Sequence, residues 1–322
     1  MEKDADILSK YRLVTNKLKK RFLKKPNVAE GSEQFAALAK NLRRQECPQY
    51  SGFCCLAQAR CEHTLANAAG EAQALTEAAR SFLEAEMANR DLKCPSFEEH
   101  LSAAINCYSH AIRVHIENKQ PALGAALCME LGDVLMSLNK ASESMGHYQR
   151  AAELQSQGSG FTVLNPLDCL EALGNVASCK ISTKDYDGAL AVLTEMSYLA
   201  QERGGSAFSE KPIGAYSDIL ARCELTRVLL LMLLQPTPQR IRPEHAQTLE
   251  KYAWGSTEDS YVINFLDEDL FLLLQSVVMA CQSRDLDSLR SLQVELWPML
   301  SSEQNQLLHL IIEELNQLNF SL

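Results

Sequence analysis

One short pattern recurs four times in the first two-thirds of this chain: a small residue, an aromatic residue or Leu four positions later, and a small residue or Met three positions after that. Residues three or four positions apart share one face of an α-helix, so each copy predicts a helix with a narrow contact face. Small residues let two helices approach closely, and the larger residue fills the groove between them. The copies are Ala78/Phe82/Ala85, Ala104/Tyr108/Ala111, Ser144/Tyr148/Ala151 and a looser Ala189/Leu193/Met196.

Two of these copies follow a Leu-Gly pair. Leu131-Gly132 precedes the copy with Tyr148, and Leu173-Gly174 precedes the copy with Leu193. This order is typical of the tetratricopeptide repeat, a pair of helices that stacks on its neighbours with a period of about 34 residues. The copies are 26, 40 and 45 residues apart, which indicates a degenerate array with variable loops. Stacked helix pairs present an extended surface to other proteins, so a protein-binding protein is the first hypothesis.

The organisation predicted for the chain is helical throughout. A linker rich in Gly and Ser at 203–213 separates an N-terminal region with the degenerate repeats, 1–202, from a C-terminal helical region, 214–322, packed on the same array. Capping boxes at Ser96/Glu99 and Ser301/Gln304 predict two helix starts. No segment alternates apolar and polar residues over the length of a strand. The predicted fold is all-α, a tetratricopeptide-like helical-hairpin array (α-solenoid) with a C-terminal helical segment.

Charge is distributed unevenly along the chain. Residues 1–50 contain 12 Lys and Arg against 6 Asp and Glu, whereas the rest contains 19 against 35, which gives a net charge of −10 overall. A basic end on an acidic body suggests two contact surfaces of opposite sign. It argues against a nucleic-acid-binding protein, whose body should carry the positive charge.

Composition and motifs favour a reduced intracellular protein that is not an enzyme. The eleven Cys include no C-x-x-C pair and fall within apolar helical patterns, where Cys acts as a small hydrophobic residue. The acidic start is unlike a signal peptide, and the longest apolar run, 228–234, is too short to span a bilayer. No phosphate-binding loop, nucleophile elbow or H-E-x-x-H motif occurs, so no cofactor is expected. Cys107, His110 and His115 form no metal site on spacing, because the two His lie on different helix faces.

The segment 10–25 predicts an amphipathic basic helix. Tyr11, Val14, Leu18 and Phe22 form its apolar stripe, and cations occupy the remaining surface. A contact with an acidic partner, a nuclear-localisation patch and a solvated face all remain open. Membrane attachment is the weaker alternative, since only Phe22 and Leu23 would insert. The candidate partner-binding residues are Lys17, Lys19, Lys20, Arg21, Lys24 and Lys25.

A second set of candidates lies near the C-terminus. Asp267, Glu268 and Asp269 precede or begin a helix, where acids suit the helix dipole; docking to a basic patch is the alternative for the cluster. Phe271 begins an apolar run that is buried either in the protein's own core or against a partner. Trp297 ends a helix before Pro298; core packing is its favoured role, and an interface anchor is the alternative.

Four longer strings carry a resemblance to a known family. They are YRLVTNKLKKRFLKKPNVAE at 11–30, PEHAQTLEKY at 243–252, LFLLLQS at 270–276 and SLQVELWPML at 291–300. On these strings the chain resembles the family of the forty-kilodalton huntingtin-associated protein, also called the factor VIII intron-22 protein. The strings lie toward both ends, so the resemblance covers nearly the whole chain. Relatives can carry a longer proline-rich insertion near 203–213, whereas this linker is short.

The resemblance implies a partner and a cellular role. It implies a one-to-one heterodimer in which this chain lies between the helical-repeat domains of huntingtin and stabilises their conformation. It also implies recruitment of huntingtin to early endosomes through an active Rab GTPase, in a cytoplasmic protein with early-endosomal and nuclear pools. The alternative is a vesicle-trafficking factor that binds a Rab GTPase or a membrane directly. Neither nucleic-acid binding nor integral membrane association is expected.

Overall fold

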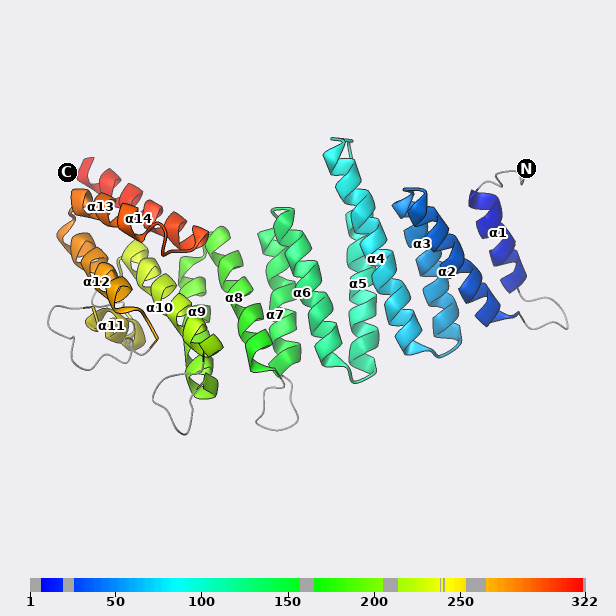
Figure 1. Cartoon of the computed structure of the whole chain (residues 1–322), viewed down its shortest axis with the longest axis horizontal. Helices are drawn as coiled ribbons and strands as arrows, with labels where there is room; N and C mark the ends of the chain where they lie inside the picture. The colour runs from blue at the N-terminus through cyan, green and yellow to red at the C-terminus, as the bar shows by residue number, and fades with distance from the viewer. Residues whose placement is uncertain are drawn as a thin grey trace. The chain divides into compact units, whose positions relative to one another are not determined.

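The computed structural model describes residues 7–19, 26–156, 165–204, 214–237, 239, 241–252 and 265–320. Helices account for nearly all of these residues, and no strand occurs among them (Figure 1). The chain divides into two compact units, Met1–Val134 and Leu135–Leu322, which we call unit 1 and unit 2. The division falls within helix α6 (Pro121–Ser137).

Unit 1 is a run of helices in which each packs against the next. Short turns join them, and the residue that leaves a helix is often left-handed, as at Glu46 and Ala66 with φ of 57° and 54°. Asn27 and Asn67 cap the following helices by accepting the backbone N–H of Glu30 and Gly70. Before α6, the helices are α1 (Ile7–Leu18), α2 (Val28–Arg44), α3 (Pro48–Thr64), α4 (Ala68–Asp91) and α5 (Glu99–Glu117).

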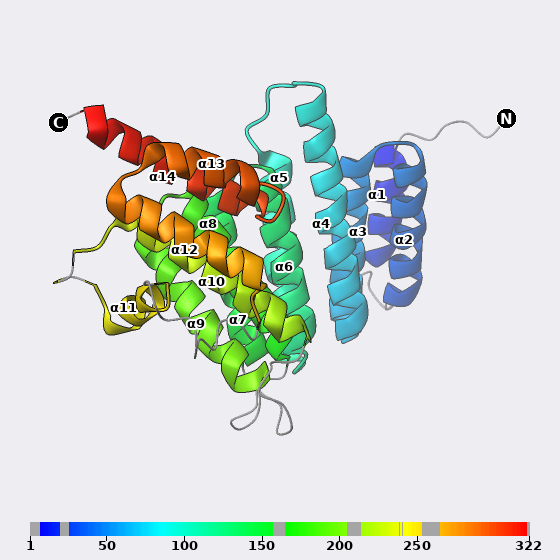
Figure 2. The same ribbon diagram turned by 60° about the vertical axis from the view of Figure 1, so that its left-hand side comes forward.

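Unit 2 begins in the same way, with α7 on α8, α8 on α9 and α9 on α10, so the tetratricopeptide-like helical-hairpin array is confirmed. Helix α10 then contacts α11, α12 and α14 as well (Figure 2). Because α10 is covered on every side, it needs no polar face, and eleven of its residues are buried. The helices are α7 (Ala141–Ser156), α8 (Pro166–Ser182), α9 (Tyr186–Gly204), α10 (Gly214–Leu234), α11 (Pro243–Glu250), α12 (Glu268–Ser283), α13 (Leu286–Leu296) and α14 (Ser302–Phe320).

The recurring pattern forms the core in both units. All twelve of its residues are at most 4% exposed, and they lie on α4, α5, α7 and α9. The copies on α4 and α5 are only 26 residues apart because these two helices are direct neighbours. The copies on α5, α7 and α9 lie on alternate helices, at the spacing of a helix pair. The pattern therefore marks buried helix faces, and only its later copies mark successive helix pairs.

A polar cluster joins three helices of unit 1. Arg80 of α4 donates through Nε and Nη2 to the carboxylate of Glu130 on α6, at 2.7 and 2.8 Å. The buried Tyr108 of α5 donates its hydroxyl to the same carboxylate at 2.7 Å. The hydrogen bond from Arg80 lowers the pKa of Glu130, so the carboxylate stays ionised.

Unit 2 contains a more deeply buried cluster. Arg227 lies 3.2 Å from Glu224 and donates to the hydroxyl of Thr248 at 2.8 Å. Lys251 approaches the other carboxylate oxygen of Glu224 at 3.3 Å. Glu224 and Arg227 are 3% and 6% exposed, so each charge depends on the other for its compensation.

Of the two predicted helix starts, the structure confirms one and corrects the other. The capping box at Ser301 is confirmed, since the backbone N–H of Ser301 and Gln304 each donate to the other's side chain. The box at Ser96 is wrong by two residues: Glu98 is the N-cap, and Ser96 instead accepts the N–H of Glu98. Helix α9 continues through Gly204, and 205–213 of the predicted linker lies outside the described residues. The division at 203–213 stays a prediction.

Candidate partner-binding surfaces

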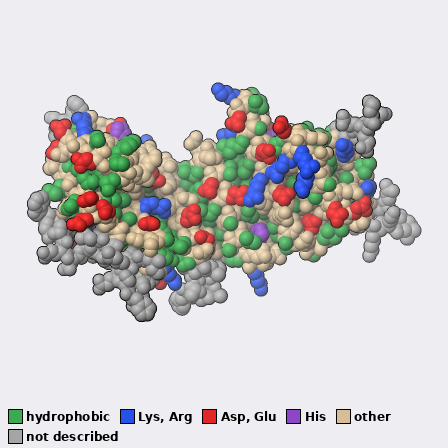
Figure 3. Space-filling model, in the orientation of Figure 1, with side chains coloured by type: hydrophobic (Ala, Val, Ile, Leu, Met, Phe, Trp, Pro, Cys, Tyr) green, Lys and Arg blue, Asp and Glu red, His purple; other side chains and the backbone are tan. Residues whose placement is uncertain are grey.

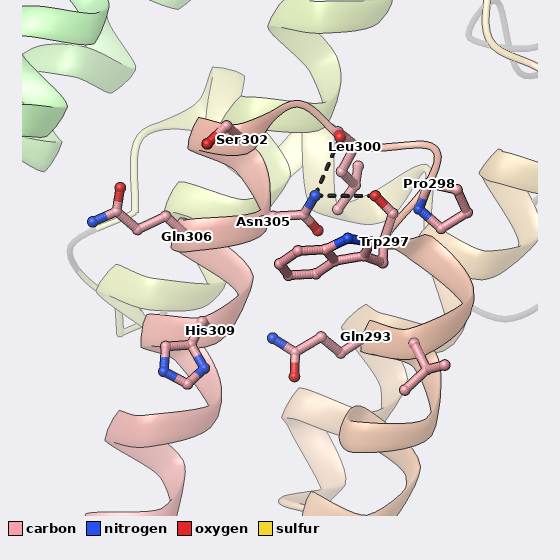
Figure 4. A pocket seen from close by; sticks show the side chains of 9 residues that line it. Gln293, Trp297, Pro298, Leu300, Ser302, Asn305, Gln306 and His309 are labelled. Atoms are coloured by element: carbon pink, nitrogen blue, oxygen red, sulfur yellow. Dashed lines mark hydrogen bonds between the residues drawn. The ribbon is translucent and has the colours of Figure 1, made fainter.

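The turn between α13 and α14 forms a groove of about 990 Å³ (Figure 4). Helix α13 starts with Asp285, which accepts the N–H of Ser288, and Pro298 follows its last turn. Helix α14 starts at the capping box of Ser301. We call this surface the α13–α14 groove; its lining residues are Gln293, Val294, Trp297, Pro298, Leu300, Ser302, Asn305, Gln306 and His309.

Asn305 fixes the turn and also leaves one buried polar atom without a partner among the described residues. Its Nδ2 donates to the carbonyl oxygens of Trp297 at 3.1 Å and Leu300 at 3.2 Å. Two carbonyl partners identify this atom as the nitrogen, because only the amide N–H can donate to them. The opposite atom, Oδ1, has no partner among the described residues, although Asn305 is only 7% exposed. Figure 4 shows this oxygen on the side of the Trp297 indole. The groove therefore has an apolar wall, and the unpartnered oxygen is buried rather than exposed to a partner.

Trp297 is 62% exposed and Val294 is 74% exposed, so the expectation that Trp297 packs in the core is wrong. Helix α13 buries Leu289 and Leu296, seven residues apart on one line of the helix. Val294 and Trp297 are three residues apart on another face of the helix, and this face lines the groove. Among the aromatic side chains of unit 2 whose burial is described, Trp297 is the most exposed.

The acidic candidates lie at the same end of the α12–α13 hairpin as Trp297. Asp267, Glu268 and Asp269 are exposed at the start of α12, and none forms an ion pair with a described residue. Figure 3 shows acidic and hydrophobic side chains mixed over α12 and α13. Phe271, by contrast, is buried and stacks on Tyr252 with ring centroids 5.1 Å apart, so it offers no surface to a partner.

Within the described residues, the basic helix ends before the predicted end at residue 25. It ends at Leu18, whose side chain covers Gly31 of α2. Tyr11 and Val14 pack in the same small core as Leu18, and Phe22, the fourth residue of the predicted stripe, lies outside the described residues. Lys17 lies 3.7 Å from Glu30, and Lys19 is exposed just beyond the helix. The remaining candidates lie outside the described residues: Lys20, Arg21, Lys24 and Lys25.

No metal-binding group appears within the part of the chain that the structure describes. Cys107 is buried, His110 approaches Glu71 at 3.4 Å, and His115 lies 3.1 Å from Gln120. All eleven cysteines are free thiols, nine of them buried; Cys47 is half-buried and Cys94 is exposed. None of the described helices has the length and apolar character needed to cross a bilayer.

Comparison with known proteins places the chain in a family. It is 46% identical to the 40-kDa huntingtin-associated proteins of Rattus norvegicus and Mus musculus over alignments 361 positions long. These alignments cover 96% of this chain and 93% of each relative. The chain belongs to the 40-kDa huntingtin-associated protein family. Residues 16–202, more than half of the chain, also match the family described as soluble NSF attachment protein, SNAP.

Most of this family match to soluble NSF attachment proteins covers α2–α9, whereas the alignment to the rat and mouse huntingtin-associated proteins extends over almost the whole chain. Among solved structures, a Rap protein complexed with competence and sporulation factor aligns over 98% of this chain and 76% of that chain, at 13% identity and a TM-score of 0.42. That overlay is too loose to carry an argument. The α13–α14 groove lies outside the segment matched to soluble NSF attachment proteins, in the part shared with the 40-kDa huntingtin-associated proteins.

Proposed function

We propose that this chain is a non-catalytic adaptor that binds huntingtin in a one-to-one complex, lies between its helical-repeat domains and stabilises their arrangement. The observation that carries the proposal is 46% identity over 96% of the chain to proteins named for association with huntingtin. The array of helix pairs supports it, because such arrays act through surface rather than chemistry.

The α13–α14 groove supplies the anchor in this proposal. Trp297 and Val294 bury against an apolar ridge of huntingtin. Aromatic side chains that become fully covered dominate binding energies, and a single one contributes about 2 kcal/mol or more. Asp267, Glu268 and Asp269 then face a basic surface beside that ridge and speed association.

The first experiment is co-expression with huntingtin, followed by size-exclusion chromatography and thermal melting. A one-to-one complex that melts above either free protein is expected, because binding stabilises only the folded forms. A stable free chain that does not co-elute with huntingtin contradicts the proposal. Trp297→Ala should weaken the complex about 30-fold or more while leaving the melting temperature of the free chain unchanged. Tyr198→Ala is the matched control, since Tyr198 is an equally exposed aromatic on α9, at 58%.

The finer part of the proposal is a link to early endosomes through a Rab GTPase, in a cytoplasmic protein with early-endosomal and nuclear pools. The complex, rather than the free chain, should bind a Rab GTPase loaded with a GTP analogue. Capture of the GTPase by the free chain alone would contradict recruitment through huntingtin. Imaging of the tagged chain with and without huntingtin tests the endosomal pool.

The match to soluble NSF attachment proteins supports a second candidate, a vesicle-trafficking factor that binds a Rab GTPase or membrane directly. Its surface would be the basic N-terminal segment, where Lys19 is exposed. Liposome binding by the free chain, abolished by reversing the charges of Lys17, Lys19, Lys20 and Arg21, would favour it. Loss of huntingtin binding with the same variant, without liposome binding, would favour the adaptor.

A further inference from the structure

The connection between α4 and α5 presents two large apolar side chains to solvent. Phe97 is 100% exposed and Leu92 is 74% exposed, and no other large hydrophobic side chain of the described residues is wholly exposed. Helix α4 has 24 residues against 17 in α3, so its last turns extend past the start of α3. Figures 1 and 2 both show this end of α4 projecting beyond α3. We call residues 92–98 the α4–α5 tip.

The helix end that begins the α4–α5 tip is closed by backbone hydrogen bonds. Lys93 is left-handed with φ of 53°, its N–H donates to the carbonyl of Arg90, and the N–H of Cys94 donates to the carbonyl of Asn89. These two bonds form a Schellman motif, which satisfies the last carbonyls of the helix. Leu92 therefore sits on a closed helix end, where its backbone has partners.

Side chains fix the other half of the tip. The N–H of Phe97 donates to the carboxylate of Glu99 at 3.1 Å, and Arg90 donates to Glu98 at 2.9 Å. Arg90 also donates to Glu86 at 3.0 Å, and Glu86 is only 1% exposed. The tip is thus tied through Arg90 to a buried carboxylate of α4. These hydrogen bonds fix the backbone of the connection at Phe97, whose side chain is exposed.

Holding an aromatic side chain in water has no benefit for this fold, because exposed apolar surface is unfavourable and Phe97 packs on nothing. It has a large benefit for binding. The backbone at Phe97 is already ordered by its hydrogen bond to Glu99, so the connection loses little backbone entropy when a partner covers the ring. Exposed aromatic residues are frequent anchors of protein interfaces.

Charge around the tip indicates which partner fits. Residues 90–99 contain three acids, Asp91, Glu98 and Glu99, and two cations, Arg90 and Lys93. Arg90 already contacts Glu86 and Glu98. At this end of α4, Figure 3 shows hydrophobic side chains beside both acidic and basic ones. Because Glu98 is paired with Arg90, the exposed charges that remain are Asp91 and Glu99 against Lys93, and this small negative excess is not attracted to the negative surface of cytoplasmic membranes. It complements a basic rim around an apolar pocket on a protein.

We propose that the α4–α5 tip is a second anchor, in which Phe97 and Leu92 enter an apolar, basic-rimmed pocket of the protein partner. This inference rests on the proposed function and deepens it, since it assigns unit 1 a contact with huntingtin of its own.

The test measures the affinity of full-length variants for huntingtin. Phe97→Ala should weaken binding about 30-fold or more, and Phe97→Tyr should retain most of it, because the pocket still receives an aromatic ring. Neither variant should shift the melting temperature of the free chain, since Phe97 contacts no core residue. Leu123→Ala is the matched control; Leu123 is 51% exposed on α6 of the same unit and should bind as the wild type does.

Cys94 offers an independent probe, because it is the exposed thiol of the tip. Modification with a bulky maleimide should block binding to huntingtin, and the Cys94→Ser variant treated in the same way should bind normally. Unchanged affinity of Phe97→Ala, or equal loss in Leu123→Ala, overturns the proposal. Phe97-dependent sedimentation with phosphatidylcholine–phosphatidylserine vesicles overturns it in favour of a membrane contact. A wild-type chain that does not bind huntingtin overturns both proposals, whereas wild-type binding with an unaffected Phe97→Ala overturns only the tip.

Discussion

The two units use charged clusters in different ways. In unit 1, Arg80 and Glu130 meet at the surface, with 53% and 32% of their side chains exposed. In unit 2, Arg227 and Glu224 are enclosed, because α10 is covered by α9, α11, α12 and α14. Water still solvates the charges of the first pair, whereas the charges of the second pair are compensated only by protein groups. Removing one partner of the pair should therefore cost little in unit 1 and much in unit 2.

The largest expected effect comes from separating the buried pair. Arg227→Met should lower the free energy of unfolding by about 3–5 kcal/mol, because Glu224 keeps a buried charge with reduced compensation. Arg80→Met in unit 1 should lower it by about 1 kcal/mol or less. Urea denaturation of the two variants measures the difference. The double variant Arg227→Met/Glu224→Met should recover much of the loss; equal effects of Arg227→Met and Arg80→Met would break the comparison.

Packing at glycines gives the next effect, with opposite signs in the two units. A Cβ on Gly52 of α3 would lie 2.9 Å from ring atoms of the buried Phe82, whereas a Cβ on Gly146 of α7 would meet nothing within 4 Å. Gly52→Ala should therefore cost about 1–3 kcal/mol through overpacking, even though Ala favours helix. Gly146→Ala should stabilise by about 0.5–1 kcal/mol through helix propensity. Thermal unfolding checks both signs, and a stabilising Gly52→Ala would show that α3 and α4 can move apart freely.

The smallest effect is a difference in acid sensitivity. Burial lowers the pKa of His147 and His245 in unit 2 below its ordinary value of 6.5. An unfolded chain binds these protons first, so the stability of α7 and α11 should begin to fall as pH drops below about 6.5 and continue to fall through the folded pKa values. In unit 1 the lowered pKa of Glu130 acts in a different window, below its ordinary value of 4.5.

Hydrogen exchange of backbone amides at pH 7.5 and pH 6 resolves the two windows. Protection in α7 and α11 should decrease between these values after correction for intrinsic exchange, and His245→Gln should remove the effect at α11. Protection around the Arg80–Glu130–Tyr108 cluster should hold. Loss of protection there at pH 6 would contradict the separation of the two windows.

Much of the helical architecture follows from local sequence signals. Small and large residues at spacings of four and three marked buried helix faces, and all twelve such residues are core. Asn27, Asn67 and Asp285 cap helices by accepting nearby backbone N–H groups, an interaction that needs no distant partner. The reciprocal box of Ser301 and Gln304 was predicted for the same reason.

The binding surfaces were less predictable. Trp297 and Phe271 both lie in apolar helical surroundings, and the sequence favoured the core for the one that is exposed. Their difference depends on which line of each helix meets a neighbour, and that is set by residues far away in the chain. Asn305 gave no signal, because its partners are backbone carbonyls of the preceding turn. The capping box predicted at Ser96 placed Phe97 in the first turn of a helix, so neither its position in the connection nor its complete exposure was predicted.

The sequence by itself determined that the chain is helical, where α14 begins, and which residues of the repeated pattern are buried, because short-range hydrogen bonds and periodicity fix these features. Its long matching strings determined the family. Only the tertiary structure decided that α10 is enclosed, that Gly52 must admit a phenyl ring, and that Trp297 and Phe97 face solvent. Exposure and close approach are properties of helix pairs and depend on how far each helix extends past its neighbour.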